Sequence, residues 1–143
     1  MTMDGLRTEA RVMPADDLRE RLERWSRSTG IDVEVWALPG RPLPGHVAEL
    51  VQATVLDVLD GLEGDGSVRS VGIALTAGAR GLRLTVSGHG QGLPPDRLAD
   101  RLRVRDAQFA ELGGGVSVNV VPGGGVTVSA ALPGRPVSRR RGR

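Results

Sequence analysis

The fold is decided by residues 68–92, which read VRSVGIALTAGARGLRLTVSGHGQG. Two runs rich in valine, leucine and isoleucine, residues 68–76 and 82–87, predict two strands. The short segment 77–81 between them contains two glycines and predicts a tight turn. A glycine-rich segment, residues 88–92, follows and is expected to be a loop. The centre of the chain is therefore predicted to be a β-hairpin that leads into a glycine loop.

The strongest helix signal lies just before this hairpin, at residues 45–62. Apolar residues recur there at the i, i+3, i+4, i+7 spacing of a helix with one buried face. Gly61 and the segment from Gly64 to Gly66 are expected to end it. A further helix is predicted over residues 14–28, because apolar residues again share one face.

Between these helices, residues 31–37 alternate between apolar and polar and predict a half-buried strand, and the proline-rich segment 38–44 predicts a loop. After the glycine loop, residues 95–112 predict one helix, and 116–121 with 126–132 predict a second hairpin. The order of elements predicts an α/β (α+β) two-layer sandwich. It would have a mixed, mainly antiparallel sheet with helices packed on one face.

The composition is that of one ordinary globular domain of 143 residues. The net charge is only +2, and all 19 basic residues are arginine. The absence of cysteine excludes disulfides and thiolate sites. We find no apolar run long enough for a membrane span and no signal peptide, so we expect a cytoplasmic protein. We divide the chain into a flexible N-terminus (1–13), a domain (14–133) and a disordered, arginine-rich tail (134–143).

Four segments resemble the ATP-binding domain of bacterial sensor histidine kinases, which belongs to the GHKL superfamily. Residues 29–33 look like the entry to the first strand, and 50–59 align with the helix that carries the N box. Residues 84–92 align with the first glycine box, and 112–133 match the closing hairpin. The resemblance implies the Bergerat fold, with ATP and Mg²⁺ as cofactors.

The N box departs from the family pattern at both of its functional positions. In the family it holds a glutamate that acts as general base and, one helical turn later, an asparagine whose oxygen binds Mg²⁺. The aligned residues here are Ala53 and Asp57. Alanine cannot accept a proton, so we predict no catalytic residue. Asp57 keeps a hard oxygen ligand and is our candidate metal site, although it could equally be an ordinary residue on an exposed helix face.

The glycine boxes are also altered. The aspartate that accepts a hydrogen bond from adenine aligns with Gly88, which has no side chain. His89, Gly90 and Gly92 complete our candidate cofactor-binding set, and they leave open whether the backbone turn still holds a nucleotide. The second glycine box aligns with residues 101–104, which contain no glycine. We therefore expect binding of ATP and Mg²⁺ to be weak or absent.

The remaining charged residues are expected to have ordinary structural or surface roles. The only histidines, His46 and His89, both align inside the ATPase-like domain, so we expect no phosphoacceptor helix in this chain. Arginines and aspartates alternate over residues 96–106, which is typical of a solvated helix face. The basic tail 139–143 could touch nucleic acid, but no aromatic residues accompany it for base stacking, so we do not expect a nucleic-acid partner.

Two functions fit these observations. The first is a degenerate histidine-kinase-type ATPase-like domain that acts as a regulatory or protein-binding module in bacterial signal transduction. Its partner would be a protein, either a kinase or a regulator, and a homodimer stays open. The alternative is a divergent ATP-binding domain that retains nucleotide binding or slow ATPase or kinase activity.

Overall fold

The computed structural model describes residues 12–13, 15–90, 95–121 and 125–134. The helices are α2 (Ala15–Thr29), α3 (Gly45–Asp65), α4 (Pro95–Arg101) and α5 (Arg103–Glu111). The strands are β1 (Val12–Met13), β2 (Asp32–Ala37), β3 (Leu43–Pro44), β4 (Ser70–Gly78), β5 (Gly81–His89), β6 (Gly115–Val121) and β7 (Gly125–Pro133). Nearly all of the predicted N-terminal and C-terminal segments lies outside the described residues.

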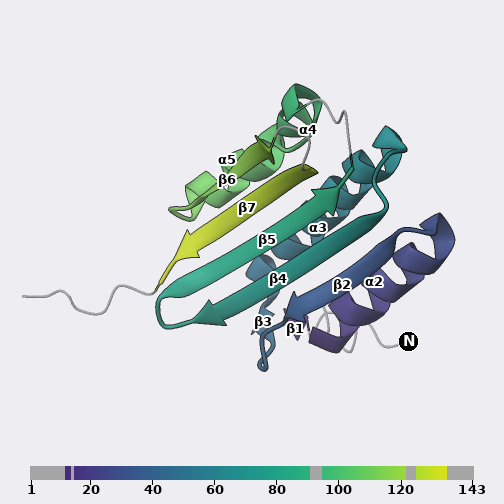
Figure 1. Cartoon of the computed structure of the whole chain (residues 1–143). Coiled ribbons are helices and arrows are strands. Elements are labelled where there is room, and N and C mark those ends of the chain that lie inside the picture. The colour runs from purple at the N-terminus through teal and green to yellow at the C-terminus, as the bar shows by residue number, and fades with distance from the viewer. Residues whose placement is uncertain (1–11, 14, 91–94, 122–124, 135–143) are drawn as a thin grey trace, which may run out of the picture.

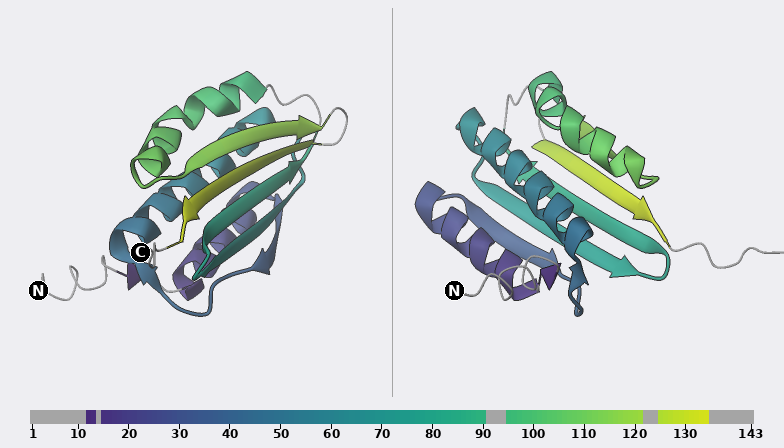
Figure 2. Two further views of the ribbon diagram at one scale, coloured as in Figure 1. Left: turned by 90° about the vertical axis from the view of Figure 1, so that its left-hand side faces the viewer. Right: turned by 180° about the vertical axis from the view of Figure 1, so that it is seen from behind.

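Five strands form one sheet in the order β2-β4-β5-β7-β6. Strands β2 and β4 run parallel, and the other neighbouring pairs are antiparallel. Helices α2, α3, α4 and α5 all lie on the same face of this sheet (Figures 1 and 2). The predicted two-layer α/β sandwich with a mixed, mainly antiparallel sheet is therefore confirmed.

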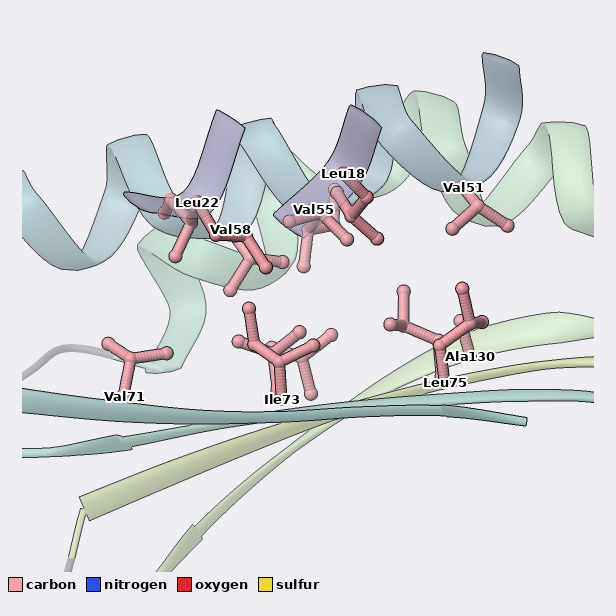
Figure 3. Packing of buried hydrophobic residues seen from close by; sticks show 14 of the residues in the cluster. Leu18, Leu22, Val51, Val55, Val58, Val71, Ile73, Leu75 and Ala130 are labelled. Carbon is pink, nitrogen blue, oxygen red and sulfur yellow. The ribbon is translucent and has the colours of Figure 1, made fainter. Parts of the chain in front are cut away.

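The core lies between the two layers. Strand alternation turns every second side chain toward the helices, and each helix contributes one apolar face. Figure 3 shows these side chains meeting in one layer, where each is at most 1% exposed: Leu18, Leu22, Val51, Val55, Val58, Val71, Ile73, Leu75 and Ala130. Thr54 is the one polar residue that is buried in the described part of the chain, and it donates its hydroxyl proton to the carbonyl of Leu50 at 2.7 Å. The apolar face of α3 is thus closed without an unsatisfied hydroxyl.

The opposite face of the sheet carries mainly polar and charged side chains, among them Glu34 and Arg83, and it also carries Trp36. Trp36 lies over Gly72, where a Cβ would collide with the indole ring. The ring is 51% exposed, and its Nε1 donates a hydrogen bond to Oε1 of Glu34 at 3.1 Å. The pairing of β2 with β4 shifts register between Val35 and Ala37, which is where Trp36 sits.

Helix α3 is longer than predicted, because Gly61 and Gly64 lie inside it. The helix ends at Asp65, and Gly66 then takes a left-handed conformation with φ 81°. Only this last glycine has the backbone angle that stops a helix. Gly61 serves packing instead, as described below.

The predicted helix 95–112 is interrupted. It forms α4 and α5, separated at Leu102, whose amide is shared between the carbonyls of Leu98 (3.0 Å) and Ala99 (3.2 Å). This shared hydrogen bond tightens one turn and ends the regular helix. Leu102 remains 2% exposed, so the break does not withdraw it from the core.

Two further differences concern short strands. Val12–Met13 and Leu43–Pro44 pair as β1 and β3, in segments predicted as a loose lead-in and a loop. Strands of two residues are too short to show alternation, which is why the pattern missed them. Gly88 and His89, predicted as part of the glycine loop, instead extend β5: both pair with β4, and Gly88 also pairs with β7.

Candidate functional site

The N-box helix and the first glycine box, far apart in sequence, come together on the helix side of the sheet. Helix α3 presents Ala53 and Asp57 on one face, since they are one turn apart. Strand β5 ends at Gly88 and His89, and Gly90 follows. Gly92, the remaining predicted residue, lies outside the described residues.

Asp57 is joined to α5 by an ion pair. Its Oδ2 accepts a hydrogen bond from Nε of Arg105 at 2.6 Å. Nη1 of the same guanidinium donates to Oε1 of Gln108 at 3.0 Å, so Arg105 is fixed from two sides. Both charged side chains are 26% exposed. The one carboxylate that the N box keeps therefore already has a cation beside it.

The position aligned with the adenine-binding aspartate is packed against a leucine. Gly88 is buried, and a Cβ built on it would lie 3.0 Å from Cδ2 and 3.1 Å from Cδ1 of Leu62. Leu62 itself is 0% exposed. An aspartate at position 88 would thus have to place its carboxylate among the methyl groups of a buried leucine.

Between these two contacts, α3 and α4 approach closely at Gly61. A Cβ there would lie 2.9 Å from Cδ1 of Leu98 and 3.4 Å from Cδ of Arg101. A glycine at this point of the helix lets Leu98, which is 2% exposed, pack directly on the α3 backbone. Leu62, Gly61 and Asp57 together line one stretch of α3 that is covered by neighbouring elements of the chain.

The two other described residues of the glycine box, His89 and Gly90, both contact the segment that precedes β4. His89 is exposed, and its carbonyl accepts a hydrogen bond from the amide of Arg69 at 3.1 Å. A Cβ on Gly90 would lie 2.9 Å from Oγ of Ser67 and 2.9 Å from Cα of Val68. Close approach of this backbone to the 67–68 segment therefore accounts for a glycine at position 90.

An open groove of about 380 Å³ remains at the other end of α3. Residues of α3 line one side of the groove: His46, Glu49, Leu50 and Ala53. Residues of α5 and the residue after it line the other side: Arg105, Gln108, Glu111 and Leu112. Ala53, which we aligned with the general-base glutamate of the family pattern, is one of these lining residues.

No cluster of three or more histidine, aspartate or glutamate side chains suited to a metal ion occurs among the described residues. Asp57, the metal ligand predicted from the sequence, is therefore not part of such a cluster. In the same described ranges, no helix is both long and apolar enough to cross a bilayer.

Sequence reasoning missed the contact of Arg105 with Asp57 and that of Leu62 with Gly88. The alternating charges of residues 96–106 suggested a solvated face, which fits Arg103 and Asp100, a pair that is 77% and 69% exposed. Arg105, however, lies one turn before the inward-facing Phe109 and shares its side of the helix. That spacing was the signal that could have placed it near α3.

With this geometry, the chain has the fold of the ATP-binding domains of histidine kinases. One similar solved structure is the ATP binding domain of PrrB from Mycobacterium tuberculosis, with a TM-score of 0.63 and 19% identity over 87% of this chain and 96% of that one. Another is the histidine kinase domain of the blue-light activated histidine kinase EL346 from Erythrobacter litoralis. It has a TM-score of 0.64 and 20% identity over 86% of this chain.

The chain spans 62% of that kinase domain and 47% of a longer EL346 structure, which it matches with a TM-score of 0.65 and 20% identity over 87% of its own length. Neither a protein-family model nor a curated protein sequence matches the chain. The TM-scores of 0.63–0.65 establish the common fold. At identities of 19–20% the activity has to be argued from the site.

Proposed function

We propose that the chain is a degenerate histidine-kinase-type ATPase-like domain, which acts in the bacterial cytoplasm as a regulatory or protein-binding module in signal transduction. One observation carries the proposal: side chains of the chain itself contact the positions that align with nucleotide-binding residues. Leu62 packs on Gly88, and Arg105 pairs with Asp57. A scaffold retained without its nucleotide-handling groups favours a role through protein contact.

The residues present do not fit ATP with Mg²⁺. No side chain at Gly88 can accept a hydrogen bond from adenine, and a buried amino group left without its partner costs about 1–3 kcal/mol. Ala53 cannot act as general base, which in enzymes typically contributes about 10²–10⁴ in rate. Oδ2 of Asp57 already accepts a hydrogen bond from Arg105, and the positive charge of that guanidinium opposes a metal ion beside it. We therefore derive no catalytic step through the nucleotide.

The alternative is a divergent domain that retains nucleotide binding or slow ATPase or kinase activity. One contact favours it: the Asp57–Arg105 pair is partly exposed, and Arg105 also lines the open groove. Guanidinium groups bind phosphate in a bidentate manner, so Arg105 could meet a phosphate that enters the groove. In this case Arg105 would bind the phosphates, and Asp57 would be released to a metal ion.

Calorimetric titration with ATP and with ADP, with and without Mg²⁺, separates these functions. The proposal expects no heat of binding up to millimolar nucleotide. Micromolar binding that disappears in Asp57→Ala and in Arg105→Ala would overturn it and establish the alternative. Asp100→Ala, which breaks the exposed pair with Arg103, is the matched control and should change nothing in either case.

The protein-binding part of the proposal needs a separate test. Purified kinase and receiver domains from the source organism are measured for binding to the chain by biolayer interferometry. We take the open groove beside Ala53 as the contact surface, so we expect one of these domains to bind there. Ala53→Arg, which fills the groove, should weaken that binding at least tenfold. Thr76→Lys, at an exposed position of β4, serves as control. If none of these domains binds, or if Ala53→Arg and Thr76→Lys behave alike, the groove is not the contact surface and this part of the proposal is wrong.

A further inference from the structure

The two edges of the sheet differ in how they are protected. Edge strands expose unpaired backbone groups, and proteins usually guard them with charges, bulges or prolines. Strand β2 has such guards, because Asp32 and Glu34 are exposed on it and its pairing is irregular beside Trp36. Strand β6, at the other edge, reads GVSVNVV and contains neither a charge nor a proline.

The outward-pointing backbone groups of β6 can be assigned from one contact. The amide of Val116 donates to Oδ1 of Asp106 at 2.8 Å, so it points away from β7. In an antiparallel pair, outward and ladder-bonded residues alternate. Val118 and Val120 therefore also direct their N–H and C=O groups outward, and no strand covers them within the part of the chain that the structure describes. Asp106 of α5 caps one end of the edge, and the described sheet has no strand beyond β6 to pair with the rest.

The side chains of β6 divide between the two faces of the sheet. Val116, Val118 and Val120 are paired with Ala130, Val128 and Val126, which are at most 3% exposed, so these valines face the helix layer. Val120 is still 39% exposed, because no strand lies beyond it in the described sheet. Ser117 and Asn119 alternate with the valines and lie exposed on the outer face.

We infer that β6 pairs with β6 of a second copy of the chain, antiparallel and centred on Val118. The two Val118 residues then exchange both backbone hydrogen bonds, and each Val120 amide donates to the carbonyl of Val116 in the other copy. The carbonyl of each Val120 then faces the Val116 amide of the other copy, which exchanges its bond to Asp106 for a bond to this carbonyl. This register joins the two five-stranded sheets into one. The inference does not depend on whether nucleotide binds.

The side-chain pairs made by this register explain the choice of a second copy. On the helix face, Val120 is covered by Val116 of the other copy, and valine pairs directly across strands are favourable. On the outer face, Ser117 lies opposite Asn119, so no like charges meet. The same antiparallel arrangement at β2 would bring the exposed carboxylates of Asp32 and Glu34 together, which disfavours self-pairing at that edge.

Sedimentation equilibrium over micromolar to millimolar concentrations tests the inference. We expect a reversible dimer of the wild-type chain. Ser117→Lys/Asn119→Lys should raise its dissociation constant at least tenfold, because lysine then faces lysine across the pair. Ser117→Glu/Asn119→Glu should do the same. A mixture of the two variants should restore dimerisation, because lysine then faces glutamate.

Controls make the outcome specific. Thr76→Lys/Ala77→Lys adds the same charge at exposed positions of β4, three strands away, and should leave the dissociation constant unchanged. Circular dichroism confirms that the variants fold, which the exposure of Ser117 and Asn119 favours. A wild-type chain that stays monomeric up to millimolar concentration overturns the inference. This is also the result expected if the edge pairs with a strand of another protein. A dimer unaffected by the charge variants overturns it as well.

Discussion

The side chain of Leu62 in α3 lies over Gly88 in β5, where a Cβ built on the glycine would sit 3.0 Å from its Cδ2. Protein interiors are packed to a nearly uniform density, so the space beside a glycine without a side chain must be filled by a neighbour. Here a buried leucine fills it. The contact therefore links the altered glycine box directly to the core of the domain.

A double-mutant cycle should reveal this dependence. Gly88→Ala alone is expected to cost about 1–2 kcal/mol of unfolding free energy, because the new methyl group crowds Leu62. Leu62→Ala alone should cost about 2–5 kcal/mol through the cavity it leaves. In the double variant the methyl group of residue 88 enters that cavity, so the loss should be smaller than the sum. Urea unfolding measures all four free energies, and simple additivity would mean that the two residues do not share this space.

The Asp57–Arg105 ion pair should contribute modestly to stability. Both side chains are partly shielded, and pairs of this kind contribute about 0.5–1 kcal/mol. Asp57→Ala and Arg105→Ala should each lose about that amount, and the double variant should lose little more than either. The coupling should fall in concentrated NaCl. The more exposed pair of Asp100 and Arg103 is the matched control, and a coupling as large there would contradict the special position of Asp57.

Two glycines of α3 should respond oppositely to the same substitution. Alanine is favoured over glycine inside a helix by about 0.5–1 kcal/mol. Gly64 has no atom within 4 Å of a built Cβ, so Gly64→Ala should stabilise the domain by about 0.5 kcal/mol. Gly61→Ala would meet Leu98 at 2.9 Å and should cancel or reverse that gain. Thermal unfolding of the two variants makes the comparison, and an equal rise in Tm for both would show that α4 does not pack as closely as described.

Periodicity and resemblance predicted the layers of the fold because each long element has a buried face. The helix at residues 45–62 and the hairpin strands 68–76 and 82–87 were predicted within a few residues. What could not be predicted depends on contacts between distant segments. Nothing in the local pattern shows that Arg105 reaches Asp57, 48 residues earlier, or that Leu62 covers Gly88. The aligned residues told us which groups are missing, and only packing tells what takes their place.

The environment of Trp36 supplies a final prediction, on the uncovered face of the sheet. Gly72 has no room for a Cβ beneath the indole ring, so Gly72→Ala should displace Trp36 and cost about 1–2 kcal/mol. The chain has two tryptophans, and Nε1 of the other, Trp25, is buried on the helix side. Two indole N–H signals are therefore expected in a ¹⁵N-correlated NMR spectrum. Gly72→Ala should shift the signal of Trp36 and leave that of Trp25 in place.

The variant Trp36→Ala assigns the two signals and provides the stability control. Without the ring, Gly72→Ala meets no obstacle and should become neutral or stabilising, since alanine is favoured over glycine within a strand by about 0.5–1 kcal/mol. A Gly72→Ala variant that loses the same stability with and without Trp36 would show that the glycine is required by the backbone of β4 and not by the ring above it.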